Sequence, residues 1–309
     1  MAILNEYPRL RLALRIIGIV SCVAFLTVLT QVGGLVYLLS LLSRPWLKRR
    51  VPKNGWRRLA QSGVFVGAYL MASLLIVPLL AKPFGRVPLP YFGEHLKPAN
   101  LWTCILNRHY VVPELREATE SVAAQLATEF PGTTVHYLDA GFPFWDGFPL
   151  MPHLSHDDGR KLDLSFHYLD STSGSPTDDL PSWIGYGVCE DPRPGDRDRA
   201  AECRAAGHWQ YDMLSRILPQ GGKEDLALDE KRTRRMVALF SAQPWVRKIF
   251  IEPHLVSRMN LTPKKSDFMV VRLCGMTTMC MWKGEAKPSS GFQHCQRNLA
   301  EPSQAQSNK

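Results

Sequence analysis

Two long apolar runs near the N-terminus constrain this chain more than any other feature. The first extends from about Ile16 to Leu42 and carries no charge after Arg15, and the second, also uncharged, extends from about Leu59 to Ala81. A helix rises about 1.5 Å per residue, so each run is long enough to cross a hydrocarbon core about 30 Å thick. We therefore expect residues 1–82 to form a membrane anchor in which these two runs are transmembrane helices.

A cleaved signal peptide is the alternative explanation for the first run. That run is longer than the apolar region of a signal peptide and lacks a small-residue cleavage site. It is also followed by a second run of spanning length. Two membrane-spanning helices therefore explain the pattern better than a signal peptide does.

The segment between the two runs is strongly basic. It contains no acidic residue and seven basic ones, namely Arg44, Lys48, Arg49, Arg50, Lys53, Arg57 and Arg58. Short loops this basic stay on the cytoplasmic side of a membrane, so the chain from about Lys82 onward is expected to be periplasmic, on a bacterial inner membrane. Much of the formal net charge of +9 then reports membrane topology, and we expect no nucleic-acid partner.

The remainder of the chain has the pattern of an α+β domain with a small antiparallel sheet. Residues 83–112 contain many Pro and Gly residues and are typical of a connector. The next segments favour helices at 113–130 and 231–242 and strands at 133–141, 161–170 and 245–253. In the strand at 161–170, Leu162, Leu164 and Phe166 share one face, which we expect to be buried.

Cys189 and Cys203 flank a polar loop in the domain that we place outside the cytoplasm. A disulfide between them would close that loop and could stabilise the fold by about 3 kcal/mol in an oxidising compartment. Two free thiols are the alternative, and the spacing alone does not decide between these interpretations.

A histidine and a carboxylate seven positions apart form the best candidate site. His156 lies in a Gly-containing turn before a strand, and Asp163 lies just inside that strand. Imidazole nitrogens and carboxylate oxygens are both good Zn²⁺ ligands, and a catalytic zinc site needs a third protein ligand beside an open position. The alternative for such a turn is an ordinary solvated turn without a metal.

The segment SHDDGRKLDL around these two residues resembles the first zinc motif of the LAS metallopeptidases, a family that includes the penicillin-insensitive murein endopeptidases. The segment VRKIFIEPHL is similar to the strand and turn that precede the last zinc motif of the murein endopeptidase branch. The resemblance covers roughly residues 134–261, and it implies a LAS-like peptidase domain at 113–268. It also implies a zinc cofactor, with His156 and Asp163 as ligands, and peptidoglycan peptides as the substrate.

Three further residues are candidates for a second shell or for the cleft of such a site. His153 either lines the cleft or caps the loop, and His254 either offers a nitrogen near the site or is a surface residue at a turn. Glu252 is a general base in principle. In the resembling family, however, catalysis is assisted by the first His of a His-x-His motif whose second His binds zinc.

No His-x-His motif occurs in this chain. If the codons of Met269 to Lys283 use mostly GC-rich third bases, reading them from the third base of the Met269 codon gives Gly-(Cys)-x-Ala-Val-Arg-His-Asp-Asp-His-Val-His-Val-Glu. The Cys and the histidines of this string depend on permissive third bases. This string contains the motif where the family has it. We therefore hypothesise a frameshift near Phe268 that leaves residues 269–309 as an aberrant, disordered tail, and coincidence is the alternative.

Two other classes of function stay open at this stage. The outer domain could bind wall peptides or a protein partner without cleaving them, because two ligands alone hold Zn²⁺ poorly. The helices themselves could belong to a transporter or an assembly factor. Neither apolar run has an ionisable residue at its centre, and this absence argues against a transport pathway.

Overall fold

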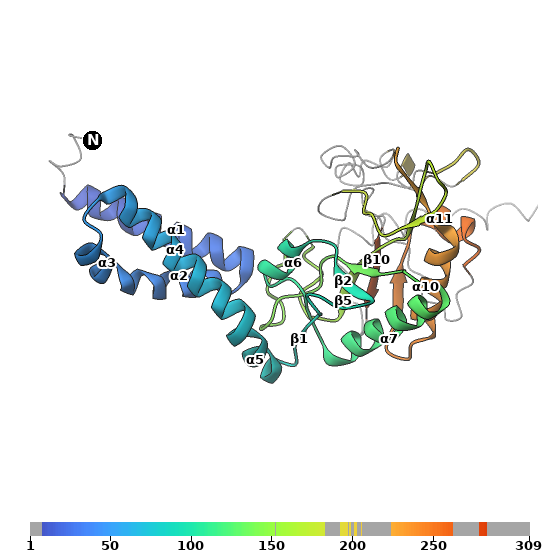
Figure 1. Cartoon of the computed structure of the whole chain (residues 1–309), viewed down its shortest axis with the longest axis horizontal. Helices are drawn as coiled ribbons and strands as arrows, with labels where there is room; N and C mark the ends of the chain where they lie inside the picture. The colour runs from blue at the N-terminus through green and yellow to red at the C-terminus, as the bar shows by residue number, and fades with distance from the viewer. Residues whose placement is uncertain are drawn as a thin grey trace, which may run out of the picture. The chain divides into compact units, whose positions relative to one another are not determined.

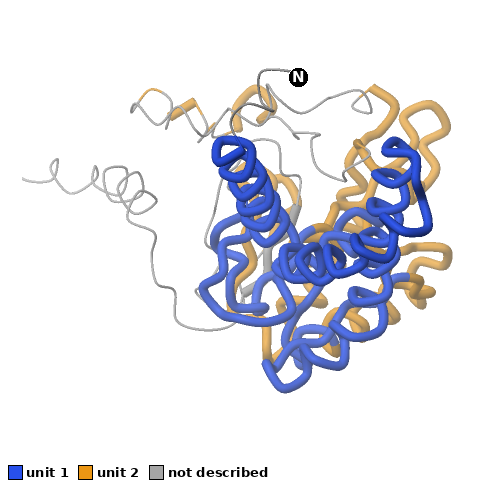
Figure 2. Tube along the Cα trace, turned by 90° about the vertical axis from the view of Figure 1, so that its left-hand side faces the viewer, with its two compact units in different colours: residues 1–91, 101–116, 139–161 blue, residues 92–100, 117–138, 162–309 orange. Residues whose placement is uncertain are grey.

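A computed structural model describes most of the chain. The described residues are 8–151, 153–182, 192–196, 198, 201–202, 205, 224–261 and 278–282. The chain divides into two compact units, each built from segments that are distant in the sequence (Figure 2). Unit 1 comprises residues 1–91, 101–116 and 139–161, and unit 2 comprises residues 92–100, 117–138 and 162–309.

Unit 1 begins with the helices that the apolar runs predict. Their bounds are α1 (Pro8–Thr30), α2 (Gly33–Ser40), a 3-10 turn (Leu41–Ser43), α3 (Arg44–Arg50), α4 (Asn54–Met71), a π-helical turn (Ala72–Ile76), α5 (Val77–Ala81) and a second 3-10 turn (Lys82–Phe84). Among the described residues, two stretches are long and apolar enough to cross a membrane: Pro8–Thr30, which contains an 18-residue window with a mean hydropathy of 2.4, and Asn54–Phe84, which contains one with 2.3. The second stretch contains the predicted span at 59–81.

The first helix differs from its predicted bounds of 16–42. It begins at Pro8 and ends at Thr30, and the chain reverses at Gln31, whose φ is 65°. A Cβ on Gly33 would lie 2.6 Å from the Thr30 hydroxyl oxygen, and one on Gly34 would overlap the Thr27 side chain. These two glycines therefore let α2 pack closely back against α1 (Figure 1). Hydropathy alone cannot detect such a reversal, because both arms of the turn are apolar.

Unit 2 contains a five-stranded sheet in the order β2 (Leu96–Pro98), β4 (Val135–Tyr137), β5 (Lys161–Ser165), β10 (Thr278–Trp282) and β9 (Lys248–Phe250). A second sheet has the order β7 (Pro176–Thr177), β6 (Tyr168–Asp170) and β8 (Leu226–Leu228). In these two sheets, β2 pairs with β4 in parallel, whereas β4 with β5, β9 with β10, and β6 with both β7 and β8 are antiparallel pairs. The expected α+β class is confirmed at this level.

The remaining elements described are α6 (Leu101–Ile105), β3 (Tyr110–Val111), α7 (Pro113–Glu129), α10 (Glu230–Ala242) and α11 (Pro253–Arg258), together with β1 (Val87–Pro88), which pairs with β3. Pro at its first position and Glu114 in its first turn suit the start of α7. At α10, the Asp229 carboxylate caps the helix by accepting a hydrogen bond from the Arg232 backbone N–H at 2.9 Å.

The stretch predicted as one strand at 161–170 is two strands in different sheets. Its first half is β5 and its second half is β6. Between them, the His167 N–H donates to the Thr233 hydroxyl at 3.2 Å, and the His167 carbonyl accepts from the Asp229 N–H at 2.9 Å. These bonds to the start of α10 take the place of the strand-to-strand hydrogen bonds that a continuous strand would make at His167. The alternation of apolar and polar residues over 161–170 therefore continues although the chain passes from one sheet to the other.

The core of unit 2 lies against both faces of β5. Leu162, Leu164 and Phe166 are buried as the alternation predicts, and Asp163 and Ser165 on the opposite face are buried as well. Apolar residues of α7 and α10 contribute further to the buried set, namely Val122, Leu126, Met236, Val237 and Phe240. Because Asp163 is buried, its carboxylate needs polar or cationic partners.

The C-terminal segment 269–309 is described only at Thr278–Trp282, which forms β10 and pairs with β9 in register Cys280 to Phe250. The rest of the predicted disordered tail lies outside the described residues. An apolar pentapeptide, TMCMW, suits a strand in a sheet interior.

The fold predicts a specific sensitivity to acid at His167. Burial, with a smaller contribution from the nearby Arg232 guanidinium, lowers the pKa of His167 from 6.5 to about 3. Between pH 6.5 and about pH 3 the unfolded chain therefore binds a proton at this histidine, whereas the native chain does not. As the pH falls through that range, the free energy of unfolding decreases by up to about 1.4 kcal/mol per pH unit. We expect His167→Gln to reduce the slope of unfolding free energy against pH between 6.5 and 4, as measured by denaturation in detergent.

His95→Gln, at a half-exposed histidine, is the control, and an equal slope in wild type and His167→Gln contradicts the prediction.

Candidate metal centre

The candidate site is built by the loop between β4 and β5 together with the start of β5. The loop is fastened at both ends by backbone hydrogen bonds: Leu138 N–H donates to the Asp163 carbonyl at 2.8 Å, and Val112 N–H donates to the Gly159 carbonyl at 2.9 Å. Tyr110 N–H also donates to the Gly141 carbonyl at 3.0 Å. A loop held at several points can place its side chains reproducibly.

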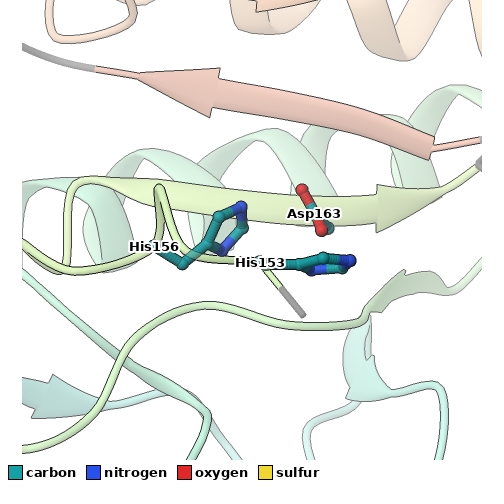
Figure 3. Close-up of side chains that lie close together, drawn as sticks. All are labelled: His153, His156 and Asp163. Atoms are coloured by element: carbon teal, nitrogen blue, oxygen red, sulfur yellow. The ribbon is translucent and has the colours of Figure 1, made fainter. Parts of the chain in front are cut away.

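Three side chains converge at this site, His153, His156 and Asp163 (Figure 3). Each offers one ligand atom, and these atoms all lie within 4.8 Å of one another. His156 and Asp163 are each 3% exposed. The pair that the sequence singled out is thus brought together, and the three residues could hold a metal ion.

His153 belongs to the ligand group, whereas the sequence indicated only a second-shell or cleft position for it. The signal that could have identified it is the spacing of three between His153 and His156, which brings two imidazoles to one side of a tight turn. The His156 N–H donates to the His153 carbonyl at 2.9 Å, so the intervening residues close such a turn. The two imidazole rings lie 5.3 Å apart between centroids.

The donor set fits a zinc ion. Two imidazole nitrogens and one carboxylate oxygen are three ligands of the types that catalytic zinc sites use, and such sites leave a fourth position open. Zinc–ligand distances are about 2.0–2.2 Å. The three ligand atoms, which lie within 4.8 Å of one another, would therefore move slightly closer together around a bound ion. The burial of His156 and Asp163 limits competition from water for their ligand atoms.

Two consecutive residues orient the two histidines. The His156 Nδ1 lies 2.8 Å from the Ala140 carbonyl oxygen, and the His153 Nδ1 lies 3.4 Å from Oδ2 of Asp139. A carbonyl oxygen only accepts, so the His156 Nδ1 carries a proton in this contact, and in the neutral form of the ring the lone pair is then on Nε2. Carboxylate and carbonyl partners of this kind fix the tautomer and the direction of metal-binding imidazoles.

Asp139 is itself held by an arginine. The Arg108 Nε donates to Oδ1 of Asp139 at 2.8 Å, and its Nη2 donates to Oδ2 at 2.7 Å. Both side chains are largely buried. This two-point contact fixes the plane of the carboxylate that faces His153, and planar arginine is suited to such a contact.

A second arginine, Arg86, supports the far end of the loop. Its buried guanidinium forms an ion pair with Asp146, and it packs against Gly159, whose φ is 66°. A Cβ on Gly159 would overlap the Arg86 side chain. Arg86 therefore contacts the loop on both sides of the two histidines, and Gly159 is required for its fit.

Glu252 and His254 are not in the described ligand group. They lie at the start of α11, where the His254 Nδ1 is 3.4 Å from Oε2 of Glu252. Cys189 and Cys203, the predicted disulfide pair, lie outside the described residues. Neither Cys22 nor Cys104 takes part in a disulfide among the described residues.

Comparison with known proteins adds no assignment to this site. A scan against protein-family models and a search of curated proteins gave no match to the chain. The resemblance to LAS metallopeptidases therefore stays a prediction from the motifs, and the convergence of His153, His156 and Asp163 is the observation on which a function can be argued.

The orientation of His153 by Asp139 predicts the effect of removing that charge. Asp139→Asn keeps the side-chain shape but weakens the contacts with His153 and Arg108, and loss of such an outer partner costs about 10–100-fold in metal affinity. Competition with a chelating dye measures the zinc affinity of the full chain. Glu129→Gln is the matched control, because Glu129 also accepts two hydrogen bonds from an arginine, Arg235, but on the surface. Equal zinc affinities in both variants would contradict this role of Asp139.

Two glycines of the loop provide a matched pair for testing the Arg86 contact. Gly147 and Gly159 both have positive φ, 78° and 66°, but a Cβ on Gly147 meets open space. Gly147→Ala should therefore cost about 1 kcal/mol of backbone strain alone. Gly159→Ala should cost about 1–3 kcal/mol more because of the overlap with Arg86. Thermal unfolding in detergent compares the two, and similar melting temperatures for both variants refute the proposed fit.

Proposed function

We propose that this chain is a membrane-anchored zinc peptidase of the LAS type that acts on peptidoglycan peptides, and that its last zinc motif has been lost from the reading frame. The observation that carries the proposal is the convergence of His153, His156 and Asp163 within 4.8 Å. The motif resemblance, which no comparison tests, supplies the reaction class and the substrate.

The chemistry divides between an ion and the side chains that hold it. A zinc ion at this position would activate water and polarise an amide carbonyl. In the chain as given, His153, His156 and Asp163 would provide its ligands, while Ala140 and Asp139 keep the two imidazoles turned toward it. In the restored frame, the second His of the motif would bind zinc together with His156 and Asp163, and His153 would stay beside Asp139, so that one position remains open for water. Burial of the ligands keeps the surroundings at low dielectric, which strengthens the electrostatic contribution of the site.

The position of β10 supports the frameshift hypothesis. In the shifted frame, the first His of His-x-His is read from the codons of Thr278 and Met279, and the second from those of Cys280 and Met281. These residues belong to β10, which lies next to β5 in the sheet order, and β5 carries Asp163. A restored His-x-His would therefore occupy the strand beside the one that bears a proposed ligand.

The arrangement of the first helices supports a cytoplasmic position for the basic segment. Because α2 packs back against α1, the start of α1 with Arg9, Arg11 and Arg15 lies at the same end of the helices as α3 (Figure 1). Basic residues of both segments thus gather at one end, as expected for the inner side of a membrane. The domain after Phe84 would then be periplasmic, within reach of the cell wall.

A binding domain that does not cleave is the second candidate. The amino-acid sequence as given favours a binding domain, since it contains three candidate ligands but no His-x-His pair to assist catalysis. Three ligands can retain zinc, so zinc content alone does not distinguish a peptidase from a binding domain. Hydrolysis measured alongside zinc content does separate them.

Two forms of the full chain test the proposal, one as given and one with the shifted frame restored after Phe268. We expect both to retain zinc, because His153, His156 and Asp163 are common to them, and only the restored form to hydrolyse crosslinked peptides from purified peptidoglycan. His156→Ala in the restored form is the control and should lose both zinc and hydrolysis. Zinc in neither form refutes the metal site. Zinc in both forms without hydrolysis identifies a binding domain, and a gene sequence with no His codons in the shifted frame removes the frameshift.

A further inference from the structure

The loop that carries His153 and His156 is packed against the apolar helices of unit 1. Phe144 of this loop donates its backbone N–H to Oε1 of Gln31 at 3.0 Å, and Gln31 is the buried residue at which the chain turns from α1 to α2. The Phe144 side chain also packs against a buried cluster that includes residues of both apolar stretches and of β3: Val32, Val36, Tyr69, Val77, Ala81 and Tyr110. The loop is therefore attached to the end of the helices at which α1 stops.

An aromatic group forms where the second apolar stretch ends. The ring of Phe84, the last residue of that stretch, lies 5.2 Å from the Phe144 ring and 6.4 Å from the Trp145 ring between centroids. The rings of Phe144 and Trp145 are 5.9 Å apart. Trp145 is nevertheless 58% exposed and Phe84 is 45% exposed, so the group presents a large apolar surface.

The length of the second stretch places this group at one level of a bilayer. Asn54–Phe84 has 31 residues, which is about 46 Å at about 1.5 Å per residue. A bilayer with its headgroup regions is about 40–45 Å thick, and its hydrocarbon core is about 30 Å thick. If the basic residues Arg57 and Arg58 lie at one interface, a helical stretch of this length would bring Phe84 to the headgroups of the opposite interface.

Tryptophan is the side chain most suited to that level, because its ring is apolar while its indole N–H seeks a polar partner. The neighbouring carboxylate of Asp146 is paired with the buried guanidinium of Arg86, so its charge is compensated next to Trp145. We propose that the loop bearing His153 and His156 rests on the membrane surface, with Trp145 inserted among the lipid headgroups beside Phe84. The metal loop is thereby held at the bilayer, and the peptides that reach it are those close to the membrane.

This inference rests on the membrane anchor of the proposed function and not on its zinc chemistry. Its occupant is the bilayer that the helices cross, because the aromatic group is continuous with the second stretch. A substrate peptide or sugar stacked on Trp145 is the competing occupant, and the experiment below gives it a different outcome.

The test uses the full chain in two kinds of phosphatidylcholine vesicle. In one kind the lipid carries bromine atoms on the acyl-chain carbons closest to the headgroup, and in the other the lipid is not brominated. Subtracting the fluorescence of Trp145→Phe from that of the wild-type chain isolates the emission of Trp145. We expect brominated lipid to quench this difference signal by more than half, and aqueous acrylamide to quench it weakly. Trp56→Phe is the positive control, since Trp56 lies at the exposed start of α4. Trp245→Phe reports an exposed tryptophan of unit 2 for comparison.

Each outcome bears on one claim. If bromine quenches Trp56 but quenches Trp145 no more than Trp245, the inference is overturned and the anchor stands. If neither Trp56 nor Trp145 responds to bromine, the membrane anchor itself fails. A Trp145 signal that ignores bromine but shifts on adding peptidoglycan disaccharide peptides assigns this surface to substrate and also overturns the inference.

Discussion

The contacts made by two consecutive residues, Asp139 and Ala140, are the constraint on which the proposed chemistry depends. One supplies a carboxylate to His153 and the other a carbonyl to His156, so a single backbone segment turns both imidazoles toward Asp163. Without these partners each ring could rotate or change tautomer, and a ligand nitrogen would be lost. The bidentate contact from Arg108 extends this control one shell outward.

The same loop joins the candidate metal ligands His153 and His156 to the N-terminal helices. Gln31 and Phe84 contact it at Phe144 and Trp145, while Arg86 contacts it at both ends. The ends of these helices are therefore part of the packing that shapes the loop. Damage to that packing is expected to reach the site through the backbone, since tightly packed interiors transmit small displacements.

The frameshift hypothesis and the sheet order both concern the missing His-x-His motif. If the codons have the third bases that the hypothesis requires, the shifted frame gives a His-x-His at 278–281, and the sheet order places that segment beside β5. The literal residues there still form a strand, because apolar side chains suit a sheet interior whether or not they bind metal. The two frames would differ in the ligand chemistry that this strand offers.

Much of this protein could be predicted from its sequence, for physical reasons that can be stated. Hydropathy determined that two stretches can cross a membrane, and the spacing of His156 and Asp163 in a turn before a strand determined a candidate ligand pair. Only the tertiary structure decided where the first helix ends, because close packing of Gly33 and Gly34 on α1 leaves no trace in hydropathy.

The role of His153 was likewise decided by tertiary contacts. Its partner Asp139 lies 14 positions earlier in the chain, and the arginine that holds Asp139 lies 31 positions before that aspartate. Local patterns report periodicity and short-range hydrogen bonding, whereas contacts across such separations depend on how whole elements pack. The sequence by itself thus determined which residues are able to bind a metal, and the packing of the loop decided which of them meet.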